Sequence, residues 1–163
     1  MIDLKVVLAI ILIHWIADFL FQTDKMAKGK SKNWSDLLSH TGTYSFVWLF
    51  IGGCIYLQQF RPYDPEYNKI MNIYWSYWIP RGILFVLITF IAHTVTDYFT
   101  SRLNSKLAPK EETIVLKFDV NQKEEPFIRF PNGRSYHNLF VNIGFDQVLH
   151  YTQLLLTYYI LTK

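Results

Sequence analysis

Charged residues and cysteine are both scarce in this chain of 163 residues. Only 18% of the residues are Asp, Glu, Lys or Arg, whereas an average globular chain has about 25%. The single Cys54 excludes an intramolecular disulfide framework. A net charge of +3 is too small to indicate nucleic-acid binding, and 13 Phe, 11 Tyr and 5 Trp exclude an intrinsically disordered chain. One domain, residues 1–163, is expected for this length.

Apolar residues are present in four long stretches, at about residues 4–22, 37–57, 79–101 and 139–161. A helix needs roughly 20 mostly apolar residues to cross a membrane. The sequence therefore predicts an all-α membrane protein, a four-helix transmembrane bundle whose partner is the lipid bilayer. Two alternatives stay open: the first stretch is a cleaved signal peptide, or the stretches are the buried helices of a soluble protein.

A polar insert, at about residues 105–137, separates the last two apolar stretches. Thr113–Val120 has β-branched residues in partial alternation, Pro126–Phe130 is a shorter candidate strand, and Pro131–Gly133 is a turn signal. These features predict a small β-hairpin, with an ordered loop as the alternative. The insert also contributes to the low mean hydropathy of +0.12.

Basic residues predict the orientation of the four spans. The loops after the first and third spans hold 11 of the 16 Lys and Arg residues. The loop after the second span holds only Arg61 and Lys69. Because Lys and Arg favour the cytoplasmic side, we expect a multi-pass protein of the inner (cytoplasmic) membrane, with both loops in the cytoplasm and both termini outside.

Histidine and aspartate occur four residues apart inside the predicted spans. An ionisable residue in a span is costly and indicates a functional site, and residues four apart share one helix face. The predicted orientation brings all these pairs, and His40, to one layer near the cytoplasmic side. Imidazole and carboxylate are ligands for zinc, manganese or iron. The predicted ligands of a divalent metal, zinc in the first place, are His14, Asp18, His93, Asp97, Asp146 and His150.

This chemistry predicts a metal-dependent hydrolase of a phosphoester or lipid-linked substrate, with His40 as a ligand or general base. The lysines of residues 25–32 would attract phosphate at the inner leaflet. A metal or proton transporter or relay uses the same residue types. A non-enzymatic membrane protein with a structural metal is the third alternative.

The same residues carry a resemblance to a known family. His14-x-x-x-Asp18-Phe19, then Gln22-Thr23-Asp24-x-Met26-Ala27-x-x-Lys30, His40, His93-x-x-x-Asp97 and Asp146-Gln147-x-x-His150 are the matching motifs. Their combination resembles the bacterial and phage membrane family called domain of unknown function 3307. The resemblance covers all four apolar stretches and implies no activity. A looser similarity is to predicted membrane-bound metal-dependent hydrolases, which also carry His and Asp on membrane helices.

Overall fold

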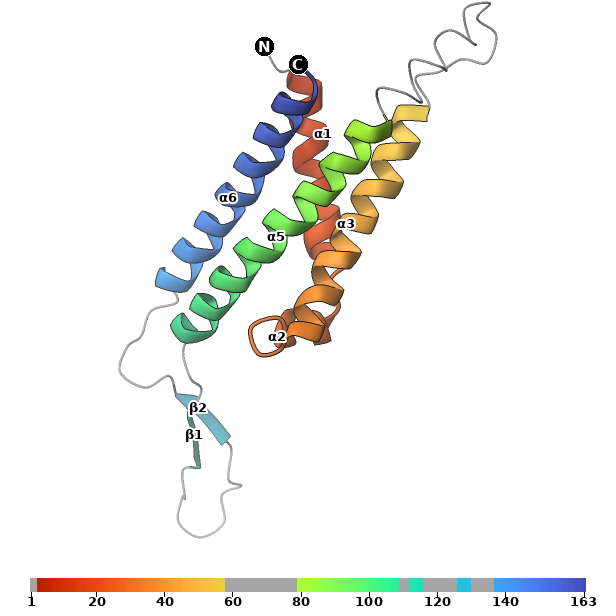
Figure 1. The fold of residues 1–163 in the computed structure, drawn as a ribbon. Helices are drawn as coiled ribbons and strands as arrows, with labels where there is room; N and C mark the ends of the chain where they lie inside the picture. Colours follow the sequence, from red (N-terminus) through yellow and green to blue (C-terminus); the bar gives the residue numbers. More distant parts are fainter. Residues whose placement is uncertain (1–2, 58–78, 109–111, 116–125, 130–136) are drawn as a thin grey trace, which may run out of the picture.

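Four long helical segments form a bundle in the computed structural model, which describes residues 3–57, 79–108, 112–115, 126–129 and 137–163. The helices are α1 (Leu4–Trp15), α2 (Asp24–Gly29), α3 (Trp34–Leu57), α5 (Ile79–Leu107) and α6 (His137–Leu161), and a π-helical turn (Ile16–Leu20) continues α1. Figure 1 shows the two chain ends at one end of the bundle, and the short helix α2 at the other. The predicted outer loop with Arg61 and Lys69 lies outside the described residues.

The helices extend beyond the apolar stretches toward the end of the bundle that carries α2. Helix α3 begins at Trp34, α5 continues to Leu107 and α6 begins at His137. Because polar residues continue a helix as readily as apolar ones, hydropathy alone could not predict these ends.

The insert contains the expected β-hairpin. Strand β1 (Glu112–Val115) pairs antiparallel with β2 (Pro126–Arg129), and Glu112 lies opposite Arg129. Both strands are shorter than the predicted segments, whose remaining residues, 116–120 and 130, lie outside the described residues. The hairpin extends away from the helices (Figure 1).

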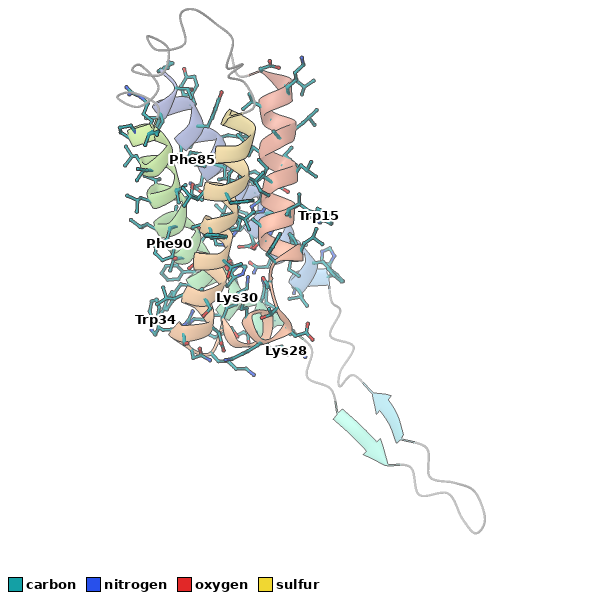
Figure 2. The ribbon with its side chains drawn as sticks, turned by 90° about the vertical axis from the view of Figure 1, so that its right-hand side faces the viewer. Trp15, Lys28, Lys30, Trp34, Phe85 and Phe90 are labelled. Atoms are coloured by element: carbon teal, nitrogen blue, oxygen red, sulfur yellow. The ribbon has the colours of Figure 1, made fainter. Side chains whose placement is uncertain are left out.

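Burial in the bundle is inverted relative to a water-soluble protein. Among the described residues, 15 polar or charged side chains are buried but only 8 apolar ones, while 28 large apolar side chains are exposed. In Figure 2 apolar side chains, such as Trp15, extend outward from the helices. An exposed apolar surface of this extent indicates contact with an apolar environment.

Seven of the eight buried apolar residues form a small core toward the end of the bundle that carries the termini. It consists of Ile10, Ile13, Ala17, Tyr44, Val47, Trp48 and Leu154. One described helix, α5 (Ile79–Leu107), has the length and apolar composition that would allow it to cross a membrane. The π-helical turn limits α1 to 12 residues, and polar residues lower the hydropathy of α6.

A tight turn after α2 determines where Lys30 lies. Thr23 caps α2, and its Oγ1 accepts a hydrogen bond from the Met26 backbone N–H over 3.3 Å. The Gly29 carbonyl accepts hydrogen bonds from the backbone N–H groups of Lys32 and Asn33. Asn33 then caps α3, because its Oδ1 accepts from the Asp36 N–H over 2.8 Å. This turn brings the Asp36 carboxyl group directly against Gly29.

Gly29→Ala should therefore destabilise the protein. The added Cβ would overlap the Asp36 carboxyl group, and overpacking of this kind costs about 1–3 kcal/mol. The expected result is a lower midpoint of thermal unfolding, measured by circular dichroism in detergent. Gly144→Ala is the matched control, because nothing lies within 4 Å of its Cβ position and Ala stabilises a helix interior by about 0.5–1 kcal/mol relative to Gly. Equal midpoints for the two variants would contradict the role of the turn.

Candidate metal centre

All seven residues predicted for the site lie in the bundle interior. None of them is more than 7% exposed: His14, Asp18, His40, His93, Asp97, Asp146 and His150. They come from α1, its π-helical turn, α3, α5 and α6. At 1.5 Å per residue, Asp97 lies about 15 Å and His93 about 20 Å from the Leu107 end of α5. Contacts among these side chains join all four long helical segments in one polar layer.

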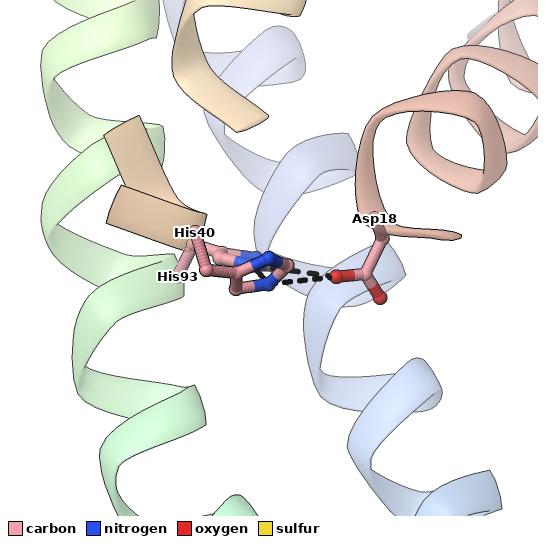
Figure 3. A group of neighbouring side chains, drawn as sticks. All are labelled: Asp18, His40 and His93. Atoms are coloured by element: carbon pink, nitrogen blue, oxygen red, sulfur yellow. Dashed lines mark hydrogen bonds and ion pairs between the residues drawn. The ribbon is translucent and has the colours of Figure 1, made fainter. Parts of the chain in front are cut away.

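Asp18, His40 and His93 form a compact triangle of potential ligand atoms. His40 Nε2 lies 3.2 Å from His93 Nε2 and 3.1 Å from Asp18 Oδ1. The third edge, His93 Nε2 to Asp18 Oδ1, is 3.6 Å. Figure 3 shows both rings directed at the Asp18 carboxyl group. With bonds of about 2.0–2.1 Å, ligand atoms of a tetrahedral zinc site lie about 3.3–3.4 Å apart. The three observed separations are close to this value, so these groups could hold a metal ion.

His93, Asp97 and His150 form a second group that could hold a metal ion. His150 Nε2 lies 3.5 Å from Asp97 Oδ1, and the Nδ1 atoms of His93 and His150 are 3.0 Å apart. The other Asp97 oxygen, Oδ2, is 3.0 Å from His40 Nε2. Asp97 thus faces both groups, one oxygen toward each. Asp146 belongs to neither group, although its Oδ1 lies 3.4 Å from His150 Nε2.

The π-helical turn brings Asp18 to His40 and His93 while Asp18 stays close to His14, its expected partner on the same helix. The sequence predicts that His14 and Asp18, four residues apart, point to one place. The wider turn, closed by a hydrogen bond from the Phe21 N–H to the Ile16 carbonyl, changes the phase of the helix at this point. His14 Nε2 is 3.8 Å from Asp18 Oδ2, while Asp18 Oδ1 lies among His40 and His93. Such turns often occur at functional sites.

His14 lies beside the centre and is held by two hydrogen bonds. Its Nδ1 accepts from the Tyr44 hydroxyl over 2.7 Å, and its Nε2 donates to Gln147 Oε1 over 2.9 Å. Gln147 Nε2 in turn donates to Asp18 Oδ2 over 3.3 Å. His14 is in neither group of potential ligands, and both its ring nitrogens are engaged. Its role as a ligand stays a prediction, and this geometry favours a positioning role.

Sequence reasoning assigned no role to Tyr44 or Gln147. The Tyr44 ring stacks on the His93 ring, with centroids 3.8 Å apart and an angle of 10°, and fixes its orientation. Gln147 connects His14 to Asp18 and also contacts Asp146. The one sequence signal for Gln147 was its place in the Asp146-Gln147-x-x-His150 motif. Tyr44 carried no signal, because a tyrosine in an apolar helix is common.

Lys30 was predicted as a surface charge, yet its ammonium group reaches the centre. Its Nζ lies 2.9 Å from Asp97 Oδ2, and its side chain is 16% exposed. Burial lowers the pKa of Lys30, but the carboxylates of Asp97 and Asp18 outweigh this effect and raise the pKa above its usual value. Lys30 therefore stays charged at neutral pH and compensates one of the buried carboxylates.

The buried carboxylates of the centre need more positive charge than Lys30 alone supplies. Three carboxylates and one ammonium group carry two net negative charges if the imidazoles are neutral. A buried net charge of this size is very costly, and either protonation of the imidazoles that face the carboxylates or one divalent cation would neutralise it. Asp18 Oδ1, Asp146 Oδ1 and His150 Nε2 are also buried without a well-aligned hydrogen bond in the described part of the chain, although Asp18 Oδ1 lies 3.1 Å from His40 Nε2 and Asp146 Oδ1 lies 3.4 Å from His150 Nε2. Buried polar atoms normally have a partner, so the donor set fits a bound cation.

No family model, curated protein or solved structure matches this chain. The resemblance to the family called domain of unknown function 3307 therefore stays a prediction.

Substitution of the histidines should separate ligands from positioning residues. His93→Gln should lose bound zinc, because His93 belongs to both groups of potential ligands. His14→Gln should keep the zinc stoichiometry and weaken zinc affinity by about 10- to 100-fold, as is usual for a group that orients a ligand. The measurement is zinc content by elemental analysis after equilibrium dialysis against a series of free zinc concentrations.

The exposed His137 supplies the matched control, and His137→Gln should leave zinc affinity unchanged. Asp18→Asn serves as a second ligand variant if His93→Gln does not fold. Complete loss of zinc from His14→Gln, in a protein that remains folded, would make His14 a ligand.

Proposed function

We propose that this chain is a multi-pass protein of the inner membrane, in which a buried divalent metal hydrolyses a phosphoester or lipid-linked substrate at the cytoplasmic face. In this proposal α1, α3, α5 and α6 form a four-helix transmembrane bundle with both termini outside. The observation that carries it is the triangle of Asp18, His40 and His93 inside an apolar exterior.

Inverted burial supports the membrane part of the proposal. Polar residues inside membrane bundles face other helices, while apolar residues face lipid. Phe46, Ile91, Phe99, Phe145 and Ile160 are each more than half exposed, and they come from three different helices. Water would make this surface strongly unfavourable, whereas lipid chains would cover it at no cost. The termini lie at the end away from the basic α2 segment (Figure 1), in agreement with the orientation expected from the basic residues.

The donor set supports the chemical part. Two imidazoles and one carboxylate, with a coordination position left open, are typical of catalytic zinc and of non-haem iron. Zinc is the first choice, with manganese or iron as alternatives. The ion would supply Lewis acidity to a phosphoryl group and activate a water molecule. In the reaction, the water oxygen forms a bond to phosphorus, the ester P–O bond breaks, and the alcohol leaves with one proton of the water.

A phosphatase assay tests this proposal. Wild-type protein in nanodiscs should release inorganic phosphate from a phosphate monoester in the presence of zinc. Asp97→Asn should reduce the rate by more than about 100-fold, the upper range for residues that only orient a ligand, because Asp97 faces both groups of ligands. The readout is released phosphate, measured together with the zinc content of each preparation.

Asp24→Asn is the matched control for this substitution. The Asp24 carboxyl group is 98% exposed and pairs only with the exposed Lys28 among the contacts of the described chain, so its rate should equal that of the wild type. A wild-type protein that carries no stoichiometric zinc, manganese or iron after loading with each of them would exclude the metal centre. Full metal occupancy without hydrolysis of any phosphoester would contradict the hydrolase and would favour a structural role for the metal.

A polar seam between α5 and α6 favours transport or proton relay as a second candidate function. Gln153 Nε2 donates to Thr89 Oγ1 over 3.4 Å and to Thr157 Oγ1 over 3.2 Å. These residues continue the polar layer toward the end that carries the termini, and Thr157 is one turn from the end of α6. The apolar core around Trp48 and Leu154 lies beside this seam and argues against a wide pathway.

Flux measurements in liposomes distinguish this candidate from the hydrolase. A transporter or relay should move zinc or protons faster than empty liposomes, and Gln153→Leu should lower that flux without changing phosphoester hydrolysis. A hydrolase should show flux equal to that of empty liposomes. Thr162→Val is a suitable control, because the Thr162 hydroxyl bonds only to the nearby Tyr158 carbonyl within the described residues.

A further inference from the structure

A cleft of about 380 Å³ lies at the end of the bundle that carries α2. Residues from the α2 turn form one wall, and residues from the last turns of α5 and the first turn of α6 form the other. The residues that line it are Ala27, Lys28, Lys30, Ser31, Lys32, Ser101, Asn104, Ser105, Ala108 and Leu139. Figure 2 shows Lys28 and Lys30 at this base of the bundle. The cleft is thus framed by three segments that are distant in the sequence.

The cleft has the charge and hydrogen-bonding groups of an anion site. Its lining among the described residues includes three lysines and no acidic residue. Serine hydroxyl groups and the amide group of Asn104 add neutral hydrogen-bonding groups at the opposite wall. Lys28 and Lys32 are exposed, and the ion pair between Lys28 and Asp24, at 3.9 Å, is itself open to water, so both ammonium groups can be reached by a ligand that enters from the aqueous side. A phosphate group carries two negative charges and several acceptor oxygens, and this lining complements both.

Lys30 connects the cleft to the metal centre. Its side chain lines the cleft, while its Nζ lies 2.9 Å from Asp97 Oδ2. Gln22 Oε1 is 3.5 Å from the same Nζ, so the ammonium group is held from two sides. A ligand in the cleft would therefore lie next to the group that contacts the buried ligands. Lys30 is thus shared by the lining of the cleft and the contacts of the centre.

We propose that this cleft binds the phosphate monoester group of the substrate. Lys28 and Lys32 bind the phosphate, and Lys30 lies between the phosphate and the metal centre. The inference deepens the proposed function, because it names a substrate class for the same site. The phosphate group can belong to a lipid headgroup or to a soluble ester, since both carry the same dianion. Leu139 and Ala108 in the lining could also contact an apolar portion of the ligand.

Binding can be measured without turnover, by calorimetry on the full-length, metal-loaded protein in detergent. The probes are inorganic phosphate, a phosphonate analogue of dihexanoyl phosphatidic acid, whose C–P bond is not hydrolysed, and dihexanoyl phosphatidylcholine, which lacks a terminal phosphate. Wild type should bind the first two and not the third. The double variant Lys28→Gln/Lys32→Gln should bind them at least about tenfold more weakly, since it loses two charges at the phosphate.

Lys25→Gln is the matched control. Lys25 is in the same segment and carries the same charge, its side chain is 85% exposed, and it does not line the cleft. It should bind all probes as the wild type does. Equal affinity for phosphate and the phosphonate lipid supports a soluble substrate, and tighter binding of the lipid supports a headgroup. Unchanged affinity in the double variant, or equal weakening in Lys25→Gln, would overturn the proposal.

The outcome is distinguishable from failure of the hydrolase itself. If phosphate binding depends on Lys28 and Lys32 but no hydrolysis is observed, the proposed hydrolase is wrong and the proposed phosphate site is confirmed. If the double variant hydrolyses the substrate with an unchanged KM and binds phosphate as the wild type does, the proposed phosphate site is wrong and the proposed hydrolase is confirmed. Circular dichroism of each variant confirms that it is folded.

Discussion

The burial of three carboxylates in one layer of an apolar bundle constrains the rest of the structure. Asp18, Asp97 and Asp146 come from different helical segments, and each needs positive charge or hydrogen-bond donors that its own helix cannot fully supply. His40 from α3 and Lys30 from the α2 turn supply two of them. Every long segment must therefore present its polar face to the same layer, which leaves its apolar face outside. The inverted burial follows from this requirement.

The same requirement explains two local features that break regular helix geometry. The π-helical turn places Asp18 beside His40 and His93, while His14 forms hydrogen bonds with Tyr44 and Gln147. The close approach of Asp36 to Gly29 forms the turn from which Lys30 reaches Asp97. Each feature would be unfavourable in an isolated helix or turn. Each directs one charged group into the centre, and the two groups have opposite charge.

Much of this arrangement could be predicted from residue spacing. Pairs four apart placed Asp97 beside His93 and Asp146 beside His150, because α5 and α6 are regular through these positions. Asp18 also lies near His14, its expected partner, but no rule of spacing reveals the π-helical turn that brings its other oxygen to His40 and His93. Lys30 was interpreted as a surface charge because four lysines in one segment are typical of a solvated loop. Its place in the motif that begins at Gln22 was the sequence signal that distinguished it from Lys25. Tyr44 was missed because its stacking on His93 joins positions 49 residues apart.

The polar residues of α6 have a consequence for biogenesis. For a chain that enters a bilayer, a segment such as α5 can partition alone, whereas α6 carries Asn142, Asp146, Gln147, His150 and Gln153 and needs partners for them. Insertion would then be cooperative between α5 and α6, with the polar face of α6 packing against α5. The residues that form the centre would also determine the order in which the protein assembles.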